Sequence, residues 1–274
     1  MKIRYMGTAA AEGIPAVFCQ CNLCRYARQY GGKDKRTRSQ SLVNDDLLID
    51  FPPDSYMHYQ LYNFDLPQIE NLLVTHNHTD HFYATDLEMR CEPLAHPEPK
   101  VMHVYSNSTV RDMFYARMPK KYNVTNKYDF CVIEPYKTYQ VGNYKVTPML
   151  AQHDKTQQCV FYGIAEGNKK LLYAHDSGYF PDPTWEYLES DSACYNLISL
   201  DGNAMCRSDG KNHMGLPDAI KVKKRLLEIG AANEKTIFVM NHFSHNGGLT
   251  HAQLQEAASD YGFLISYDGL ELEF

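Results

Sequence analysis

Hydrophobic positions form short apolar runs along the whole chain, and runs with helical spacing appear between them mainly in the second half. The short runs, bounded by turn residues, predict strands or hairpins over residues 2–7, 41–51, 71–74, 159–178, 195–202 and 236–242. Helical spacing, with caps at several ends, predicts helices over residues 109–118, 216–230 and 250–262. Strands followed by alternating strands and helices are typical of a layered α/β fold with helices outside the sheets.

The chain of 274 residues shows no linker, repeat or low-complexity segment. We therefore expect a single domain over 1–274, with a cysteine-rich loop at about 18–40. No apolar run approaches the roughly 20 residues that a membrane span requires. The first residues also lack the long apolar core of a signal peptide. A cytoplasmic protein without a membrane partner is the expectation.

The net charge is −6, from 27 basic and 33 acidic residues. An acidic chain has no overall positive field to hold nucleic acid by counterion release. A nucleic-acid partner is therefore not expected, although a local basic patch stays open. A homodimer also stays open.

The densest group of potential metal ligands lies in "THNHTDH", residues 75–81, directly after an apolar run. His76 and His78 alternate along the chain and can therefore face the same side, while Asp80 and His81 follow as the chain turns. Imidazole and carboxylate ligands from one loop suit Zn²⁺, Mn²⁺ or iron. The alternative is a solvated histidine-rich loop.

One loop cannot close two metal sites, so further ligands are expected at other strand ends. His153, Asp176 and His242 each follow an apolar run that is predicted to be a strand. Each alone is more often an ordinary surface or packed residue. Together with the histidine loop, they predict strand ends that share one rim.

This set of residues resembles the metallo-β-lactamase superfamily of metal-dependent hydrolases. The resemblance implies a four-layer αββα sandwich with two divalent metals, Zn or Mn with iron as a further candidate, at one edge. It implies one metal held by His76, His78 and His153, a second held by Asp80, His81 and His242, and Asp176 as the bridge between them.

A second cluster lies in "FCQCNLC", which contains Cys19, Cys21 and Cys24. Without a secretory signal, bunched cysteines favour metal over disulfides. Three thiolates form three quarters of a tetrahedral zinc site, and His245, close after His242, is the best candidate for the fourth ligand. The alternative is a reduced cluster without metal.

Within the superfamily, the N-terminal pattern is similar to the phosphodiesterases that open phosphoribosyl 1,2-cyclic phosphate, over nearly the whole chain. That resemblance implies a structural zinc on Cys19, Cys21, Cys24 and His245. It also implies a small phosphate ester as substrate, opened by a hydroxide that bridges two metals. Asp80 and Asp176 then serve catalysis as well as metal binding.

Other polar residues are assigned more specific expectations. His213, in "DGKNHMGLPDA", occupies the position of a proton donor in the related enzymes, or is a histidine at a helix start without chemistry. Arg36 and Arg38 bind the substrate phosphate or belong to a solvated basic loop, with neither favoured. Asp50 ends a strand and is expected to support a metal-bound histidine.

Three other functions stay open. A ribonuclease Z-like tRNA-processing endonuclease shares the metal ligands, but this chain is acidic and lacks an evident basic arm. A carboxylic-ester, thioester or lactam hydrolase is compatible with the metals, but the cysteine loop and His213 count against it. A zinc-stabilised binding module without activity is disfavoured because the ligand set is intact.

Overall fold

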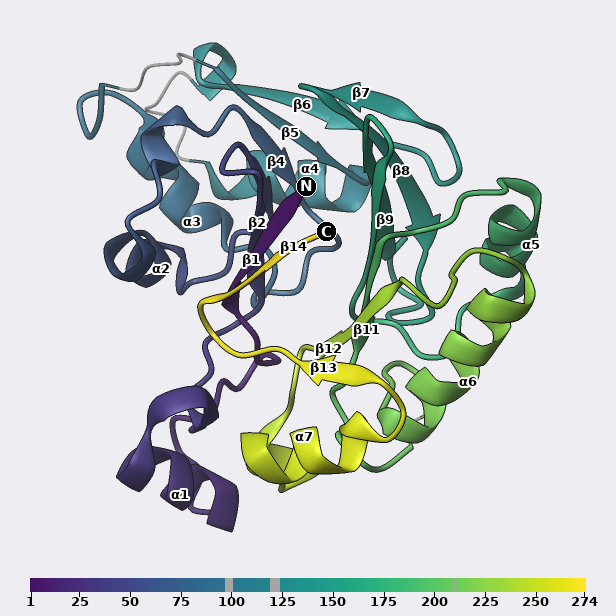
Figure 1. Cartoon of the computed structure of the whole chain (residues 1–274). Helices are drawn as coiled ribbons and strands as arrows, with labels where there is room; N and C mark the ends of the chain where they lie inside the picture. The colour runs from purple at the N-terminus through teal and green to yellow at the C-terminus, as the bar shows by residue number, and fades with distance from the viewer. Residues whose placement is uncertain (97–100, 119–123, 209) are drawn as a thin grey trace.

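Two sheets pack face to face in the computed structural model, and helices cover both outer sides (Figure 1). The structure describes residues 1–96, 101–118, 124–208 and 210–274. Each sheet has seven strands, in the orders β14-β1-β2-β3-β4-β5-β6 and β13-β12-β11-β10-β9-β8-β7. This arrangement confirms the expected four-layer αββα sandwich.

The first sheet is built mainly from the N-terminal half of the chain. Its strands are β1 (Lys2–Gly7), β2 (Gln40–Val43), β3 (Leu47–Ile49), β4 (Asn71–Leu73), β5 (Met102–Ser106), β6 (Tyr128–Val132) and β14 (Leu270–Glu273). The strands of the second sheet are β7 (Tyr139–Val141), β8 (Tyr144–Leu150), β9 (Val160–Glu166), β10 (Lys169–Ala174), β11 (Leu197–Asp201), β12 (Ile237–Asn241) and β13 (Phe263–Ile265).

The helices lie outside the sheets or between strands. The α-helices are α1 (Asn22–Tyr30), α2 (Ser55–Tyr62), α3 (Ala84–Leu87), α4 (Ser108–Arg117), α5 (Asp182–Ser190), α6 (Leu216–Glu228) and α7 (His251–Ser259). The 3-10 turns are η1 (Gly32–Asp34), η2 (Leu66–Gln68), η3 (Glu88–Arg90), η4 (Val124–Asn126) and η5 (His245–Gly247). None of the helices in the described part of the chain has both the length and the apolar character that crossing a membrane requires.

Every strand, hairpin and helix predicted above is confirmed within a few residues. The helices α1, α2, α3 and α5 were not predicted. They are short, and α2 buries only Ser55 and His58, so its hydrophobic pattern gives no helical signal.

The directions of the strands bring the carboxyl ends of several strands together at one edge of the sandwich. The pairs β8–β9 and β9–β10 are antiparallel, so β8 runs parallel to β10, and β11 and β12 run parallel to β10 as well. The carboxyl ends of these four strands therefore meet at one rim of the second sheet. In the first sheet, β3 and β4 are likewise parallel neighbours. Ligand sites favour such carboxyl ends in sheets of this kind.

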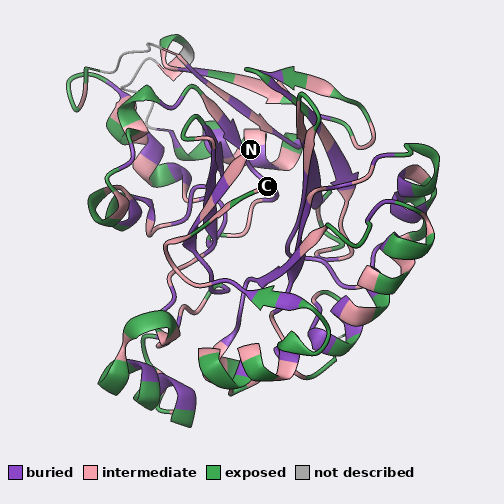
Figure 2. Ribbon diagram, in the orientation of Figure 1, coloured by how far each residue is buried: buried purple, intermediate pink, exposed green. Residues whose placement is uncertain are grey.

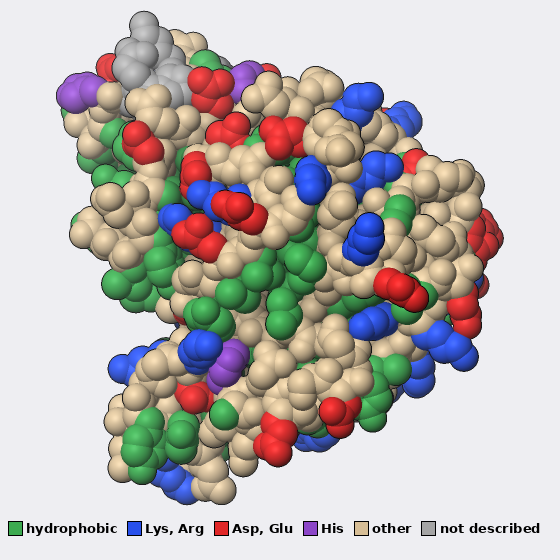
Figure 3. All heavy atoms as spheres, viewed as in Figure 1, with side chains coloured by type: hydrophobic (Ala, Val, Ile, Leu, Met, Phe, Trp, Pro, Cys, Tyr) green, Lys and Arg blue, Asp and Glu red, His purple; other side chains and the backbone are tan. Residues whose placement is uncertain are grey.

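Burial follows the four layers, because the strands are buried while the outer faces of the helices are exposed (Figure 2). One apolar cluster, which includes Tyr5, Leu73, Tyr162 and Leu171, fills the space between the sheets. A second, around Phe114, lies between the first sheet and α2, α3 and α4. On the surface shown in Figure 3, basic and acidic side chains are interspersed.

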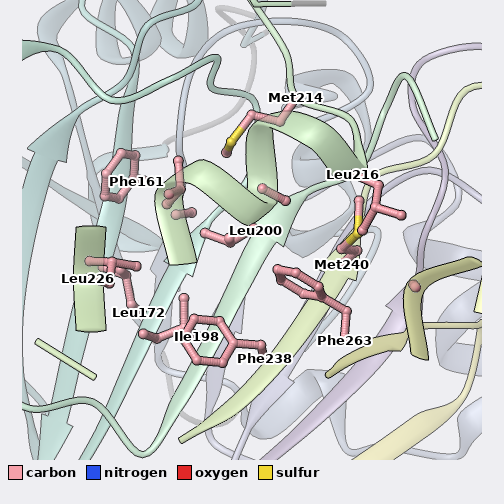
Figure 4. Packing of buried hydrophobic residues seen from close by; sticks show 14 of the residues in the cluster. Phe161, Leu172, Ile198, Leu200, Met214, Leu216, Leu226, Phe238, Met240 and Phe263 are labelled. Carbon is pink, nitrogen blue, oxygen red and sulfur yellow. The ribbon is translucent and has the colours of Figure 1, made fainter. Parts of the chain in front are cut away.

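A third cluster joins the second sheet to α5, α6 and α7. Figure 4 shows Leu200 of β11 and Met240 of β12 among these buried side chains, with Met214 and Leu216 near the start of α6. This packing fixes the last residues of β11 and β12 against the segment that precedes α6. It thereby gives the rim of the second sheet a rigid support.

Candidate metal centre

The histidine loop turns directly after β4. The backbone N–H groups of His81 and Phe82 both donate to the His78 carbonyl, at 3.0 and 2.8 Å. The Phe51 N–H donates to the His81 carbonyl at 2.7 Å, which ties the loop to the end of β3. This tight turn places the side chains of the loop against the rim of the second sheet.

The first expected ligand group is brought together by this turn. Ligand atoms of His76, His78 and His153 lie within 4.8 Å of one another. His153 follows the end of β8, and its Nε2 is 3.2 Å from His78 Nδ1. Two imidazole nitrogens that face each other at this distance are suited to share a cation.

The second expected group lies beside the first. Ligand atoms of Asp80, His81 and His242 also lie within 4.8 Å of one another. The Nε2 atoms of His81 and His242 are 3.3 Å apart, and His81 Nε2 is 3.3 Å from Asp80 Oδ2. His242 directly follows β12, so both sheets contribute to this group.

Asp176 lies between the two groups. Its Oδ2 is 2.6 Å from His81 Nε2 and 3.2 Å from His242 Nε2, while its Oδ1 is 3.8 Å from His153 Nε2. The neighbouring His175 points the other way, and its Nε2 lies 2.7 Å from Ser199 Oγ in the interior. The position of Asp176 is that of a carboxylate able to bridge two ions.

The residues that turn the strands into the site adopt an unusual backbone conformation. Asp50, Asp176 and His242 have φ angles of 64°, 50° and 65°. This left-handed region costs a residue other than glycine about 1–2 kcal/mol. This conformation turns each side chain out of the alternation of its strand and toward the site. The backbone strain therefore lies at residues of the candidate site.

The centre buries several acidic groups. Asp50, Asp80, Asp176 and Asp201 are each at most 8% exposed. Burial alone lowers the pKa of His81, but Asp176, Asp80 and Asp50 outweigh it and raise that pKa well above its usual value. Buried carboxylates at this density require positive charge nearby.

Buried polar atoms of the centre lack hydrogen-bond partners. Among the described residues, His76 Nε2 and His242 Nδ1 have no hydrogen-bond partner, and Asp176 Oδ2 has close contacts only with His81 Nε2 and His242 Nε2. Burial and the neighbouring His81 also hold the pKa of His76 well below its usual value, which favours the neutral imidazole that a metal needs. These imidazoles and carboxylates, with buried ligand atoms that lack a hydrogen-bond partner, fit two divalent cations of the Zn, Mn or Fe type.

Asp50 supports the centre from behind. Its Oδ2 lies 2.6 Å from His81 Nδ1, and its Oδ1 accepts hydrogen bonds from the Thr75 N–H at 2.9 Å and the Thr75 hydroxyl at 3.0 Å. A carboxylate on the far nitrogen fixes the orientation of a ligating imidazole. The structure thus places Asp50 in the supporting position expected from the sequence.

His213 is held by a residue that sequence reasoning missed. Asp201, the last residue of β11, has its Oδ2 2.9 Å from His213 Nδ1. Its Oδ1 accepts the N–H groups of Asn203 at 2.8 Å and Met214 at 3.1 Å. The available signal was an aspartate at a strand end, the same signal that indicated Asp176.

An open cleft of about 490 Å³ leads to the centre. Its inner end is lined by His78, Asp80, His153, Asp176, His213 and His242. Its outer end is lined by residues that the sequence did not single out, among them Glu12, Asn203, Arg207, Ser244 and Asn246. A volume of this size suits a small ligand.

The cysteines form a separate cluster. Ligand atoms of Cys19, Cys21, Cys24 and His245 lie within 4.8 Å of one another. His245 Nδ1 is 3.4 Å from Cys19 Sγ and 3.6 Å from Cys21 Sγ. Burial raises the pKa of Cys21, but the Cys24 N–H and His245 outweigh it and lower that pKa to about 6. The cluster has the composition of a tetrahedral zinc site.

Both expectations for Arg36 are wrong. The side chain is buried, and its Nη1 donates to Thr8 Oγ1 at 2.8 Å and to the Ser266 carbonyl at 2.6 Å. Its guanidinium also lies over the Phe243 ring, 4.4 Å from the centroid. Arg36 therefore joins segments far apart in sequence, and it does not line the cleft.

Arg38 does not line the cleft either. Its Nη1 lies 3.1 Å from both carboxylate oxygens of Asp54, and its Nε donates to the Ala11 carbonyl at 2.9 Å. Arg38 is thus paired with Asp54 at the edge of α2, and the phosphate contact, one of its two open alternatives, stays a prediction.

Comparison with known proteins gives the family context. Residues 46–254 match the family model described as "Beta-lactamase superfamily domain". The fold is similar to that of a new diphosphatase from the PhnP family, at 21% identity and a TM-score of 0.74, over 100% of this chain and 97% of that one. It is also similar to Zn(2+)-bound PqqB from Methylobacterium extorquens, at 17% identity and a TM-score of 0.76, over 100% of both chains.

Two further comparisons extend this picture. The short form of human tRNase Z shares the fold at 13% identity and a TM-score of 0.66, over 100% of this chain and 99% of that one. A curated relative, octanoyltransferase from Porphyromonas gingivalis (strain ATCC BAA-308 / W83), is 26% identical over 280 residues, which cover 99% of this chain and 51% of the relative. The chain thus spans about half the length of the curated relative that it matches.

The two clusters predict the metal content of the protein. Protein prepared without chelator should carry three divalent metals per chain by elemental analysis, two at the rim and one at the cysteines. Cys21→Ser should lose one of them, because a tetrahedral site then lacks a thiolate. Cys194→Ser is the control, because the Cys194 thiol accepts a hydrogen bond from Asn233 outside the cluster. This variant should keep all three metals. Full metal content in Cys21→Ser would disprove the cysteine site.

The corrected position of Arg36 predicts a stability effect. Arg36→Gln should lower the free energy of unfolding by about 3 kcal/mol, because buried acceptors lose a charged donor. Arg38→Gln, in a more exposed pair, should cost at most about 1 kcal/mol. Denaturant unfolding measures both. A raised KM for a phosphodiester in Arg36→Gln, with stability unchanged, would restore a role in substrate binding.

Proposed function

The chain belongs to the beta-lactamase superfamily of metal-dependent hydrolases, and we propose that it is a phosphodiesterase that opens a small cyclic phosphate ester of the phosphoribosyl 1,2-cyclic phosphate type. The observation that carries the proposal is the Asp201–His213 pair beside Asp176, at the inner end of the cleft. His213 could donate a proton there to a leaving group that departs poorly without one, such as an alkoxide.

The two ligand groups would hold two divalent metals, which would supply an activated water molecule and positive charge to offset that of the phosphate. The protein holds those ligands rigidly through the turn after β4 and the left-handed residues at the strand ends. Asp50, 2.6 Å from His81 Nδ1, orients that ring.

His213 is proposed as the acid for the leaving oxygen. Asp201 Oδ2 lies 2.9 Å from Nδ1 of the ring and thereby fixes the orientation of the imidazole. The ring centroid lies 4.8 Å from that of His153 and 5.6 Å from that of His242, so it borders both ligand groups. The proton would be delivered from Nε2 to the alkoxide as the phosphate ester bond breaks.

Size and charge favour a small substrate over tRNA. The cleft measures about 490 Å³. Among the described residues, its lining includes one arginine and no lysine. A tRNA-processing enzyme needs many phosphate contacts from a basic surface. The net charge of −6 and the interspersed charges of Figure 3 offer no such surface on the face shown. The proposed partner is therefore a small phosphate ester in the cytoplasm.

A second candidate function is hydrolysis of a carboxylic ester or thioester. The similarity to a protein named octanoyltransferase favours it, although only about half of that protein is matched. A screen of metal-loaded protein with bis(p-nitrophenyl) phosphate, cyclic phosphodiesters and p-nitrophenyl acetate separates the candidates. Turnover of the acetate alone would replace the phosphodiesterase proposal with this one.

The role of His213 predicts a dependence on the leaving group. His213→Ala should slow hydrolysis of a ribose cyclic phosphate by roughly 10²–10⁴-fold, because an alkoxide needs the proton. Hydrolysis of bis(p-nitrophenyl) phosphate should change far less, because p-nitrophenolate leaves readily. Steady-state kinetics on both substrates, with metal content measured in parallel, provides the test.

Asp201→Asn is the matched variant, since it keeps the size of the side chain that orients His213. It should show the same selective loss to a smaller degree. Equal losses on both substrates, or a loss of metal, would instead identify His213 as a group that positions or binds the metals.

A further inference from the structure

His78 is the most exposed histidine of the first ligand group. Its side chain is 41% exposed, whereas that of His153 is 6% exposed and His76 is buried. Packing therefore fixes the rings of His76 and His153, but it constrains the ring of His78 on one side only. A ligand that is held so loosely needs another contact to keep its ring in the orientation that a metal requires.

The two ring nitrogens of His78 have different surroundings. Nδ1 faces the ligand group and lies 3.2 Å from His153 Nε2, and the ring centroid is 4.5 Å from that of His76. Nε2 faces the loop after β8, where Asp154 Oδ2 lies 3.3 Å away. In a neutral imidazole only one nitrogen carries the proton, so Nδ1 can ligate a metal while Nε2 keeps its proton.

The carboxylate of Asp154 is itself held in place by its own loop. Its Oδ1 accepts hydrogen bonds from the Thr156 N–H at 2.8 Å and the Thr156 hydroxyl at 2.7 Å. Its Oδ2, the atom that faces His78, accepts a hydrogen bond from Gln157 Nε2 at 3.0 Å. The position of the carboxylate is therefore set by the protein and does not depend on the contact with His78.

The same loop is tied to the histidine loop. Gln157 Oε1 accepts a hydrogen bond from the Asn77 N–H at 2.9 Å, and Gln157 Nε2 donates to Asn77 Oδ1. Asn77 directly precedes His78, so these bonds fix the backbone of His78 relative to Asp154. An ordinary surface ion pair loses the freedom of two long side chains, whereas here both partners are short and their loops are already joined.

Asp154 does not belong to the metal ligands. It is absent from every ligand group in the described part of the chain, and it does not line the cleft. It lies instead in a separate groove of about 440 Å³, together with His78, His153, Lys155 and Asn212. Asp154 therefore faces the metal centre through the ring of His78.

We propose that Asp154 is a positioning residue for His78, which holds the ring with Nδ1 toward the ion of the first ligand group and thereby strengthens metal binding at the rim. A carboxylate on the far nitrogen is a common support of a ligating histidine. The second ligand group has the same arrangement, because Asp50 lies 2.6 Å from His81 Nδ1 while His81 Nε2 faces Asp176. The role concerns metal affinity, so it goes beyond the proposed function and does not depend on which ester is cleaved.

The experiment measures zinc affinity in the zinc-loaded full chain, in equilibrium competition with a chromophoric chelator. Asp154→Ala should weaken zinc binding at the rim by roughly 10- to 100-fold, as expected for the loss of such a support. Zinc at the cysteine cluster should be retained as in the parent. Replacement by Co²⁺ distinguishes the two places, because thiolate charge-transfer bands report on the cysteines. Only the ligand-field bands of the rim ions should change in Asp154→Ala.

Asp154→Asn separates orientation from charge. The amide loses the negative charge but keeps an oxygen that can accept the Nε2 proton. If Asp154 acts by orienting the ring, this variant should lose at most about fivefold in affinity and should retain the Co²⁺ spectrum of the parent. If Asp154 acts only by its charge, Asp154→Asn and Asp154→Ala should lose the same affinity, and that result would overturn the proposal.

Two controls complete the test. Asp129→Ala removes a carboxylate that lies 3.1 Å from His103 Nδ1, an exposed pair between β5 and β6, and it should keep the zinc affinity of the parent. Thr156→Val removes a donor to Asp154 but leaves the carboxylate beside His78, so its loss should stay far below that of Asp154→Ala. Unchanged zinc affinity in Asp154→Ala, or an equal loss in either control, would overturn the proposal.

Discussion

The structure depends on buried negative charge that is concentrated at one rim of the sandwich. Asp50, Asp80, Asp176 and Asp201 all lie there, and His81 alone contacts three of them. Histidines by themselves cannot compensate so many carboxylates, and several acceptors remain unpaired. The divalent metal ions that the superfamily implies would resolve both problems, because they would bring positive charge to the carboxylates and occupy the unpaired ligand atoms.

The fold meets this requirement through strand direction. Parallel strands end at the same rim, and the residue after a strand can leave the pleat if its backbone turns into the left-handed region. Asp50 and His242 follow β3 and β12 in this way, so the two sheets face each other across the metal centre. The four-layer packing behind the rim holds these strained positions in place.

The amino-acid sequence predicted the ligand set because dense histidines and residues at strand ends leave local signals. The same reasoning failed for Arg36, because "KDKRTRSQS" has the composition of an exposed loop, whereas tertiary contacts with Thr8 and Ser266 bury this side chain. Asp201 ends a strand as Asp176 follows one, but its contact with His213 left no local signal. That contact arises from the segment before α6, which folds back over the rim.

One short segment connects all the parts of the site. His242 belongs to the metal centre, His245 to the cysteine cluster, and Asn246 holds Arg207 through its carbonyl. The turn η5 contains both His245 and Asn246, so the cysteine cluster and the wall of the cleft share one turn. The cysteine cluster therefore lies beside the wall of the cleft, just beyond the end of the strand that leads to His242.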